Sequence, residues 1–98
     1  MLNKESIKLS QDFEIAETES FSKKIKIRDF ESLKRKIENF VYPQLRTNPF
    51  YGSNIKKLKG QLKNIYRYRI GNFRLFYTID SNKNIVIIID IEKRKNSY

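Results

Sequence analysis

Two short stretches, Ile65–Ile70 and Phe73–Ile79, alternate apolar and polar residues with a period of two. This pattern is typical of strands that bury one face and expose the other. The dipeptide Gly71-Asn72 lies between them and suits a two-residue hairpin turn. We therefore predict an antiparallel hairpin around this turn, whose apolar side must pack against the rest of the chain.

The alternation sorts the side chains of the hairpin onto two opposite faces. One face carries only apolar and aromatic residues, which we predict to be buried: Tyr66, Tyr68, Ile70, Phe73, Leu75, Tyr77 and Ile79. The other face carries Phe76 and the arginines Arg67, Arg69 and Arg74, and Arg69 lies opposite Arg74. Like charges placed directly opposite each other destabilise a pair of strands. The arginine face is therefore either solvated or an anion-binding site, and the crowding of its guanidinium groups favours an anion.

The charge of the chain is strongly positive and unevenly distributed. Its 98 residues carry a formal net charge of +10, and no acidic residue lies between Glu38 and Asp80. A locally basic surface favours nucleic acid or an acidic protein as partner. The acid-free segment contains lysines that we predict to contact phosphates, although any one of them can equally serve solubility: Lys56, Lys57, Lys59 and Lys63.

The composition excludes several classes of site. There is no cysteine and no histidine, which excludes disulfides, thiolate or imidazole metal ligation, and Cys-His or Ser-His catalysis. We expect no metal and no cofactor. The longest apolar run, Ile85–Ile89, is too short to span a bilayer, and residues 1–11 lack the apolar core of a signal peptide. We expect a cytoplasmic protein that does not bind membranes.

We predict a polar leader, residues 1–11, followed by a single domain, residues 12–98. Residues 12–17 alternate and predict a first strand, after which Thr18 and Ser20 are candidate helix N-caps. Residues 21–27 have helical spacing, and a second apolar stripe predicts an amphipathic helix that Pro43 should end or kink: Phe30, Leu33, Ile37, Phe40 and Val41.

The C-terminal part adds one more strand to the hairpin. Ile85–Ile91 is apolar on both faces over most of its length, as expected for a central strand covered by helices. The predicted fold is α+β. It is a small, mostly antiparallel sheet of one N-terminal and three C-terminal strands, with two N-terminal helices packed on one face.

The chain resembles the RelE/ParE toxin superfamily of type II toxin–antitoxin systems in three segments: N-P-F-Y-G-S-N-I-K-K-L-K-G at 48–60, Y-R-Y-R-I-G-N-F-R-L-F-Y at 66–77 and K-R-K-N-S-Y at 93–98. The resemblance extends over residues 12–98 and is greater to the RelE branch. It implies a toxin that cleaves mRNA in the ribosomal A site without a metal, and an acidic antitoxin as cognate partner. The ParE branch shares these segments but inhibits DNA gyrase without cleaving RNA. A basic RNA-binding module without toxicity is the third alternative.

The resemblance also implies which residues act on RNA. Arg67 and Arg69 fall on its paired basic positions and would clamp the phosphate, and Arg74 would stabilise the transition state. Arg94 would be a second clamp or a proton donor. Tyr98 would stack on a base, transfer a proton, or only pack at the sheet edge, and Phe76 would stack on a base or lie under the C-terminal tail. Relatives often have a histidine before the terminal arginine, where this chain has Lys93. The sequence leaves the general base open among Glu92, Lys93, Tyr98 and groups supplied by the ribosome.

Overall fold

The computed structural model describes residues 12–60 and 64–94. The predicted leader, Lys63 and Tyr98 lie outside the described residues. The strands are β1 (Glu14–Glu17), β2 (Ile55–Lys57), β3 (Tyr66–Ile70), β4 (Phe73–Asp80) and β5 (Ile85–Lys93). The helices are α2 (Glu19–Lys24), α3 (Glu31–Lys36) and α4 (Tyr42–Thr47), with a 3-10 turn at Arg28–Phe30 and a π-helical turn at Ile37–Val41.

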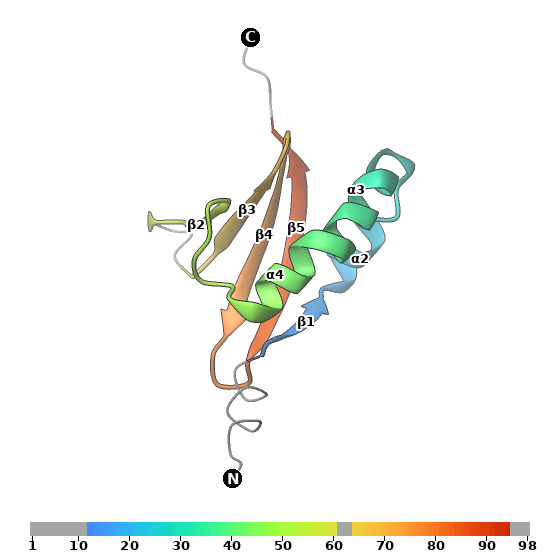
Figure 1. The fold of residues 1–98 in the computed structure, drawn as a ribbon. Coiled ribbons are helices and arrows are strands. Elements are labelled where there is room, and N and C mark those ends of the chain that lie inside the picture. The colour runs from blue at the N-terminus through green and yellow to red at the C-terminus, as the bar shows by residue number, and fades with distance from the viewer. Residues whose placement is uncertain (1–11, 61–63, 95–98) are drawn as a thin grey trace.

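The described strands form one five-stranded sheet in the order β1-β5-β4-β3-β2 (Figure 1). β1 runs parallel to β5, and the other neighbours are antiparallel. The predicted α+β fold is confirmed, with one strand more than expected. The additional strand, β2, has three residues of which only one is apolar, so the sequence gives no alternation to detect. Its place at the edge is set by pairing with Tyr66–Tyr68 of β3.

The hairpin of β3 and β4 has the predicted register. Ile70 pairs with Phe73 across the turn, and Arg69 pairs with Arg74. Gly71 has a φ of +56°, which an L side chain adopts only with strain. A positive φ at the first turn position is what a type II′ hairpin turn requires. The turn therefore fixes which residues of the two strands share a face.

The helices cover one face of the sheet (Figure 1). Thr18 is the N-cap of α2, because its hydroxyl oxygen accepts a hydrogen bond from the Phe21 N–H at 3.1 Å, as predicted. The second helical segment does not end at Tyr42 but continues through Pro43 to Thr47. Proline has no N–H to donate to the preceding turn. The helix accommodates it after a π-helical turn, in which the Tyr42 N–H donates to the Ile37 carbonyl five residues back.

The π-helical turn also explains why one residue of the predicted apolar stripe is not buried. Leu33, Ile37 and Val41 are buried, but Phe40 is 69% exposed. The wider turn keeps Val41 beneath Ile37 and rotates Phe40 toward solvent, which a stripe drawn for 3.6 residues per turn does not anticipate.

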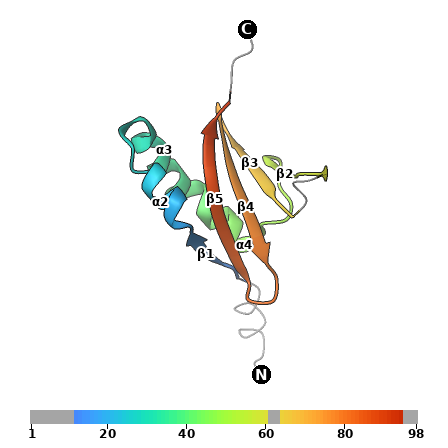
Figure 2. The same cartoon turned by 180° about the vertical axis from the view of Figure 1, so that it is seen from behind.

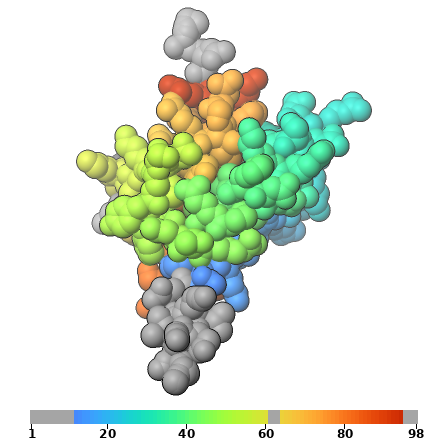
Figure 3. All heavy atoms as spheres, viewed as in Figure 1, coloured from blue at the N-terminus to red at the C-terminus, as the bar shows by residue number. Residues whose placement is uncertain are grey.

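The core lies between the helices and the tyrosine-bearing side of the sheet. Leu45, Leu75, Tyr77, Val86 and Ile88 have no exposed surface. The connector between α4 and β2 closes the same face, and its Pro49 carbonyl accepts a hydrogen bond from the Tyr77 hydroxyl at 2.8 Å. In Figure 3 the helices and this connector cover most of the sheet, with the hairpin visible above them. No helix within residues 12–60 and 64–94 is long and apolar enough to cross a membrane.

Candidate functional site

The sheet face opposite the helices carries the predicted arginines. No helix of the described residues crosses β3, β4 and β5 on this side, as Figure 2 shows. Direct pairing aligns side chains in two rows across the strands. One row runs from Lys56 through Arg67 to Phe76, and the next from Arg69 through Arg74 to Glu92. We call this surface, made of Arg67, Arg69, Arg74, Phe76 and Glu92, the arginine face.

A bulge in β5 brings an acidic residue onto this face. The register steps from Phe76↔Asp90 to Tyr77↔Ile88, which leaves Ile89 without a partner on β4. If the strand alternated regularly from the buried Ile88, Glu92 would point into the core. The extra residue reverses the parity, so that Ile91 is buried and Glu92 is exposed. The bulge therefore supplies the acid that the hairpin itself lacks.

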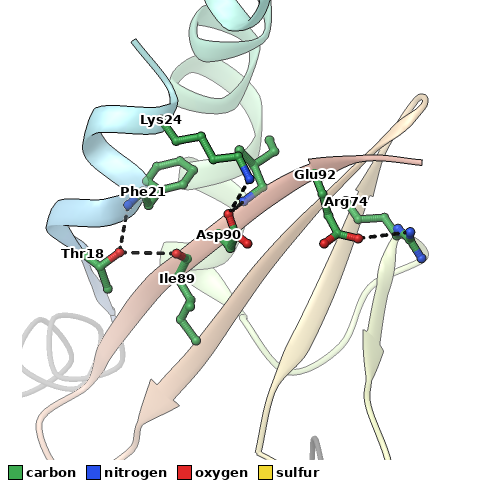
Figure 4. Close-up of polar contacts among 8 residues, drawn as sticks. Thr18, Phe21, Lys24, Arg74, Ile89, Asp90 and Glu92 are labelled. Atoms are coloured by element: carbon green, nitrogen blue, oxygen red, sulfur yellow. Dashed lines mark hydrogen bonds and ion pairs between the residues drawn. The ribbon is translucent and has the colours of Figure 1, made fainter. Parts of the chain in front are cut away.

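The first turn of α2 holds the bulge in place. The Thr18 hydroxyl donates to the Ile89 carbonyl at 3.3 Å, and the Thr18 N–H donates to the Ile88 carbonyl at 3.0 Å. Lys24 reaches Asp90 with Nζ 2.9 Å from Oδ1 (Figure 4). These contacts fix β5 where its pairing with β1 ends, and they occupy Asp90.

Arg74 and Glu92 form an ion pair on the arginine face, with Nη2 of Arg74 3.2 Å from Oε1 of Glu92 (Figure 4). Their side chains are 36% and 47% exposed, so water screens the attraction, and such a pair contributes no more than about 1 kcal/mol to stability. Glu92 does offset the charge repulsion between Arg74 and the opposing Arg69.

Two guanidinium groups retain unused donors. The Nε atoms of Arg67 and Arg74 are buried and have no hydrogen-bond partner in the part of the chain that the structure describes. A buried donor without a partner costs free energy, and a change of rotamer that brings the Nε to a ligand oxygen would recover it. Phosphate oxygens suit this fork of donors, because arginine binds them through two parallel hydrogen bonds. The arginine face therefore has the chemistry of a phosphate-binding surface.

The structure separates the remaining predicted site residues. Lys56 is in register with Arg67, whereas Lys57 pairs with Tyr66 on the other side of the sheet and places its Nζ 5.9 Å from the centre of that ring. Lys59 is exposed beyond the end of β2. Arg94 is exposed after β5, and its backbone N–H donates to the carbonyl of Asn72 beside the hairpin turn. Among the described residues, no three acidic side chains gather into a group that could hold a metal ion.

The comparison with known families agrees with this architecture. A family model described as the ParE toxin of type II toxin–antitoxin systems, parDE, matches residues 15–98. The chain belongs to this toxin family. Within the RelE/ParE superfamily it is also similar to the putative toxin RelE1 of Methanocaldococcus jannaschii, with 41% identity over 56 residues. That match spans 55% of this chain and 61% of the relative.

Solved structures confirm the RelE/ParE fold. The archaeal RelE–RelB complex of Pyrococcus horikoshii contains a chain that matches with a TM-score of 0.69 and 18% identity, over 88% of this chain and 99% of that one. The isolated E. coli RelE toxin matches with a TM-score of 0.63 and 22% identity, over 87% of each chain. At these identities the similarity establishes the fold of this RelE/ParE chain. It does not identify the activity.

Proposed function

We propose that this chain is a ribosome-dependent mRNA endonuclease that inhibits translation as the toxin of a type II toxin–antitoxin system. The observation that carries the proposal is the arginine face, where the Nε donors of Arg67 and Arg74 have no partner among the described residues and Arg74 contacts the carboxylate of Glu92. Arginines that grip a phosphate next to a carboxylate suit phosphodiester cleavage by the neighbouring 2′-hydroxyl. A toxin of this kind would act in the cytoplasm, where ribosomes translate mRNA.

In this proposal the residues of the arginine face hold the scissile phosphate. Arg67 and Arg69 clamp its oxygens, and Arg74 stabilises the charge that develops on them, since guanidinium groups stay protonated at working pH. Phe76 lies in the row of Arg67 and offers a ring for base stacking. Lys56 extends this row to the sheet edge, where it would contact the next phosphate. The roles of Arg94, Lys59, Lys63 and Tyr98 in RNA binding or proton transfer remain predictions of the sequence.

Gyrase inhibition is the second candidate, because the matching family model is named for ParE. A gyrase inhibitor needs a binding surface and no reacting groups, so the carboxylate beside Arg74 would have no catalytic task. In a basic RNA-binding module without toxicity, this carboxylate would also have no catalytic task. Only the endonuclease gives Glu92 a role beyond its contact with Arg74, and this favours it over both alternatives.

A translation assay with purified components tests the proposal. We expect the purified chain to cut an mRNA that is being translated and to leave the same mRNA intact when ribosomes are omitted, because the ribosome presents the strand in the reactive conformation. A matched reaction with gyrase and supercoiled plasmid should show no trapped DNA breaks. Intact mRNA together with trapped breaks would replace the endonuclease with the gyrase inhibitor.

We also propose an acidic antitoxin as the partner of this chain. The net charge of +10, and an arginine face that no helix of the described residues crosses, favour an acidic segment that lies across the sheet and blocks the arginines. Co-expression with a short acidic protein encoded next to this chain should restore growth and yield a complex that survives at physiological salt. Failure of the two proteins to co-purify under these conditions would count against the partner.

A further inference from the structure

This inference rests on the proposed function. Cleavage of RNA by its own 2′-hydroxyl needs a group that removes the proton of that hydroxyl. The arginines cannot serve, because a guanidinium does not lose its proton at working pH. The chain has no histidine and no cysteine. Lysines and tyrosines are weaker candidates because their ordinary pKa values lie near 10, so we look first at the carboxylates near the arginines.

The three acidic residues of β4 and β5 are not equally available. Asp80 lies six positions along β4 from Arg74, and its Oδ1 accepts hydrogen bonds from the N–H groups of Asn82 and Lys83 at 3.1 Å. Asp90 is held by Lys24 and by the N–H of Ile91. Within the described ranges neither carboxylate contacts an arginine of the arginine face, whereas Glu92 contacts Arg74.

Glu92 is placed to act on a phosphate bound at Arg74. Its Oε1 contacts Nη2 of Arg74 at 3.2 Å, while Oε2 has no hydrogen-bond partner within the described ranges. The side chain is 47% exposed, so substrate can approach it. Lys93, the neighbouring alternative, is in register with Phe73 and lies on the opposite side of the sheet. The bulge at Ile89, held by Thr18, sets this choice between the two residues.

We propose that Glu92 is the general base of the cleavage reaction. Oε2 accepts the proton of the 2′-hydroxyl as the O2′–phosphorus bond forms, and the bond from phosphorus to the leaving 5′-oxygen breaks. That oxygen takes a proton from water, and the hydroxide so formed removes the proton from Glu92, which restores the carboxylate and the water. The products are a 2′,3′-cyclic phosphate and a 5′-hydroxyl end, so atoms and charge balance without a metal or an added reactant. Arg74 keeps Glu92 oriented through Oε1 and at the same time faces the phosphate.

The test compares Glu92→Gln with the unsubstituted chain in single-turnover cleavage of ribosome-bound mRNA between about pH 6 and 8.5. Glutamine keeps an oxygen that can accept from Arg74 but cannot take a proton, so we expect a loss of at least about 100-fold at pH 7. In the variant hydroxide must remove the proton, and the rate should rise about tenfold per pH unit.

Glu31→Gln is the matched control, because it makes the same change in charge on the exposed start of α3, and it should cleave like the unsubstituted chain. A Glu92→Gln rate within about threefold of the unsubstituted rate would overturn the assignment. A slow variant with a flat pH profile would also overturn it, since Glu92 would then only position Arg74. Absence of cleavage by the unsubstituted chain would instead refute the proposed function itself.

Discussion

Replacing Arg74 with alanine is expected to lower the rate of mRNA cleavage on ribosomes by on the order of several hundredfold. The guanidinium lies between Arg69 and Glu92 on the open side of the sheet, with a buried Nε that has no partner among the described residues. Removing a preorganised charge that stabilises a transition state typically costs about 3–4 kcal/mol. Single-turnover rates on translated mRNA, with denaturation curves of the same preparations, measure the effect.

The fold should survive this substitution. The ion pair of Arg74 with Glu92 is more than one third exposed at both ends, so its loss should change the free energy of unfolding by less than about 1 kcal/mol. Arg35→Ala removes the same charge from an exposed position on α3 and should leave the rate unchanged. Cleavage by Arg74→Ala at the unsubstituted rate would show that Arg74 plays no part in the chemistry.

Replacing the next residue, Leu75, should lower the stability of the fold and leave the chemistry of cleavage unchanged. Leu75 has no exposed surface and lies between Tyr68 and Ile91 on the helix-covered side of the sheet. Truncation of a fully buried leucine to alanine leaves a cavity and costs about 2–5 kcal/mol. Small domains have only about 5–15 kcal/mol of stability in total, so Leu75→Ala should lower the urea midpoint strongly.

The two variants test how the hairpin sorts its residues. Arg74→Ala should lose activity and keep its stability, and Leu75→Ala should lose stability and cleave normally per folded molecule. Leu75→Met, which keeps nearly the same volume, is the control and should cost less than about 1.5 kcal/mol. A stability loss for Leu75→Ala below about 1 kcal/mol would contradict the burial of this side of β4.

The parts of the fold that were predictable are those fixed by local pattern. Alternation and Gly71-Asn72 together specify the register of the hairpin, because the period of two and the turn leave one way to pair Ile70 with Phe73. The N-cap at Thr18 depends only on its neighbours in sequence. For the same reason, the sides of the sheet on which Arg69 and Leu75 lie follow from the sequence without any tertiary contact.

The parts that were not predictable depend on partners distant in the chain. β2 exists because Tyr66–Tyr68 pairs with it, and the helix passes Pro43 because a π-helical turn precedes the proline. The bulge at Ile89 depends on Thr18, more than sixty positions away. The sequence does contain one sign of the bulge. After a continuous apolar run, Asp90-Ile91-Glu92 resumes alternation with the parity that directs Ile91 into the core.

Primer extension on mRNA from cells arrested by this chain tests the central claim most directly. We expect new 5′ ends within translated regions when the unsubstituted chain is expressed without its antitoxin. Those ends should be absent when Arg74→Ala is expressed at the same level, because that variant folds but lacks the charge that stabilises the transition state. Full-length transcripts in cells whose growth is nonetheless arrested would contradict the account.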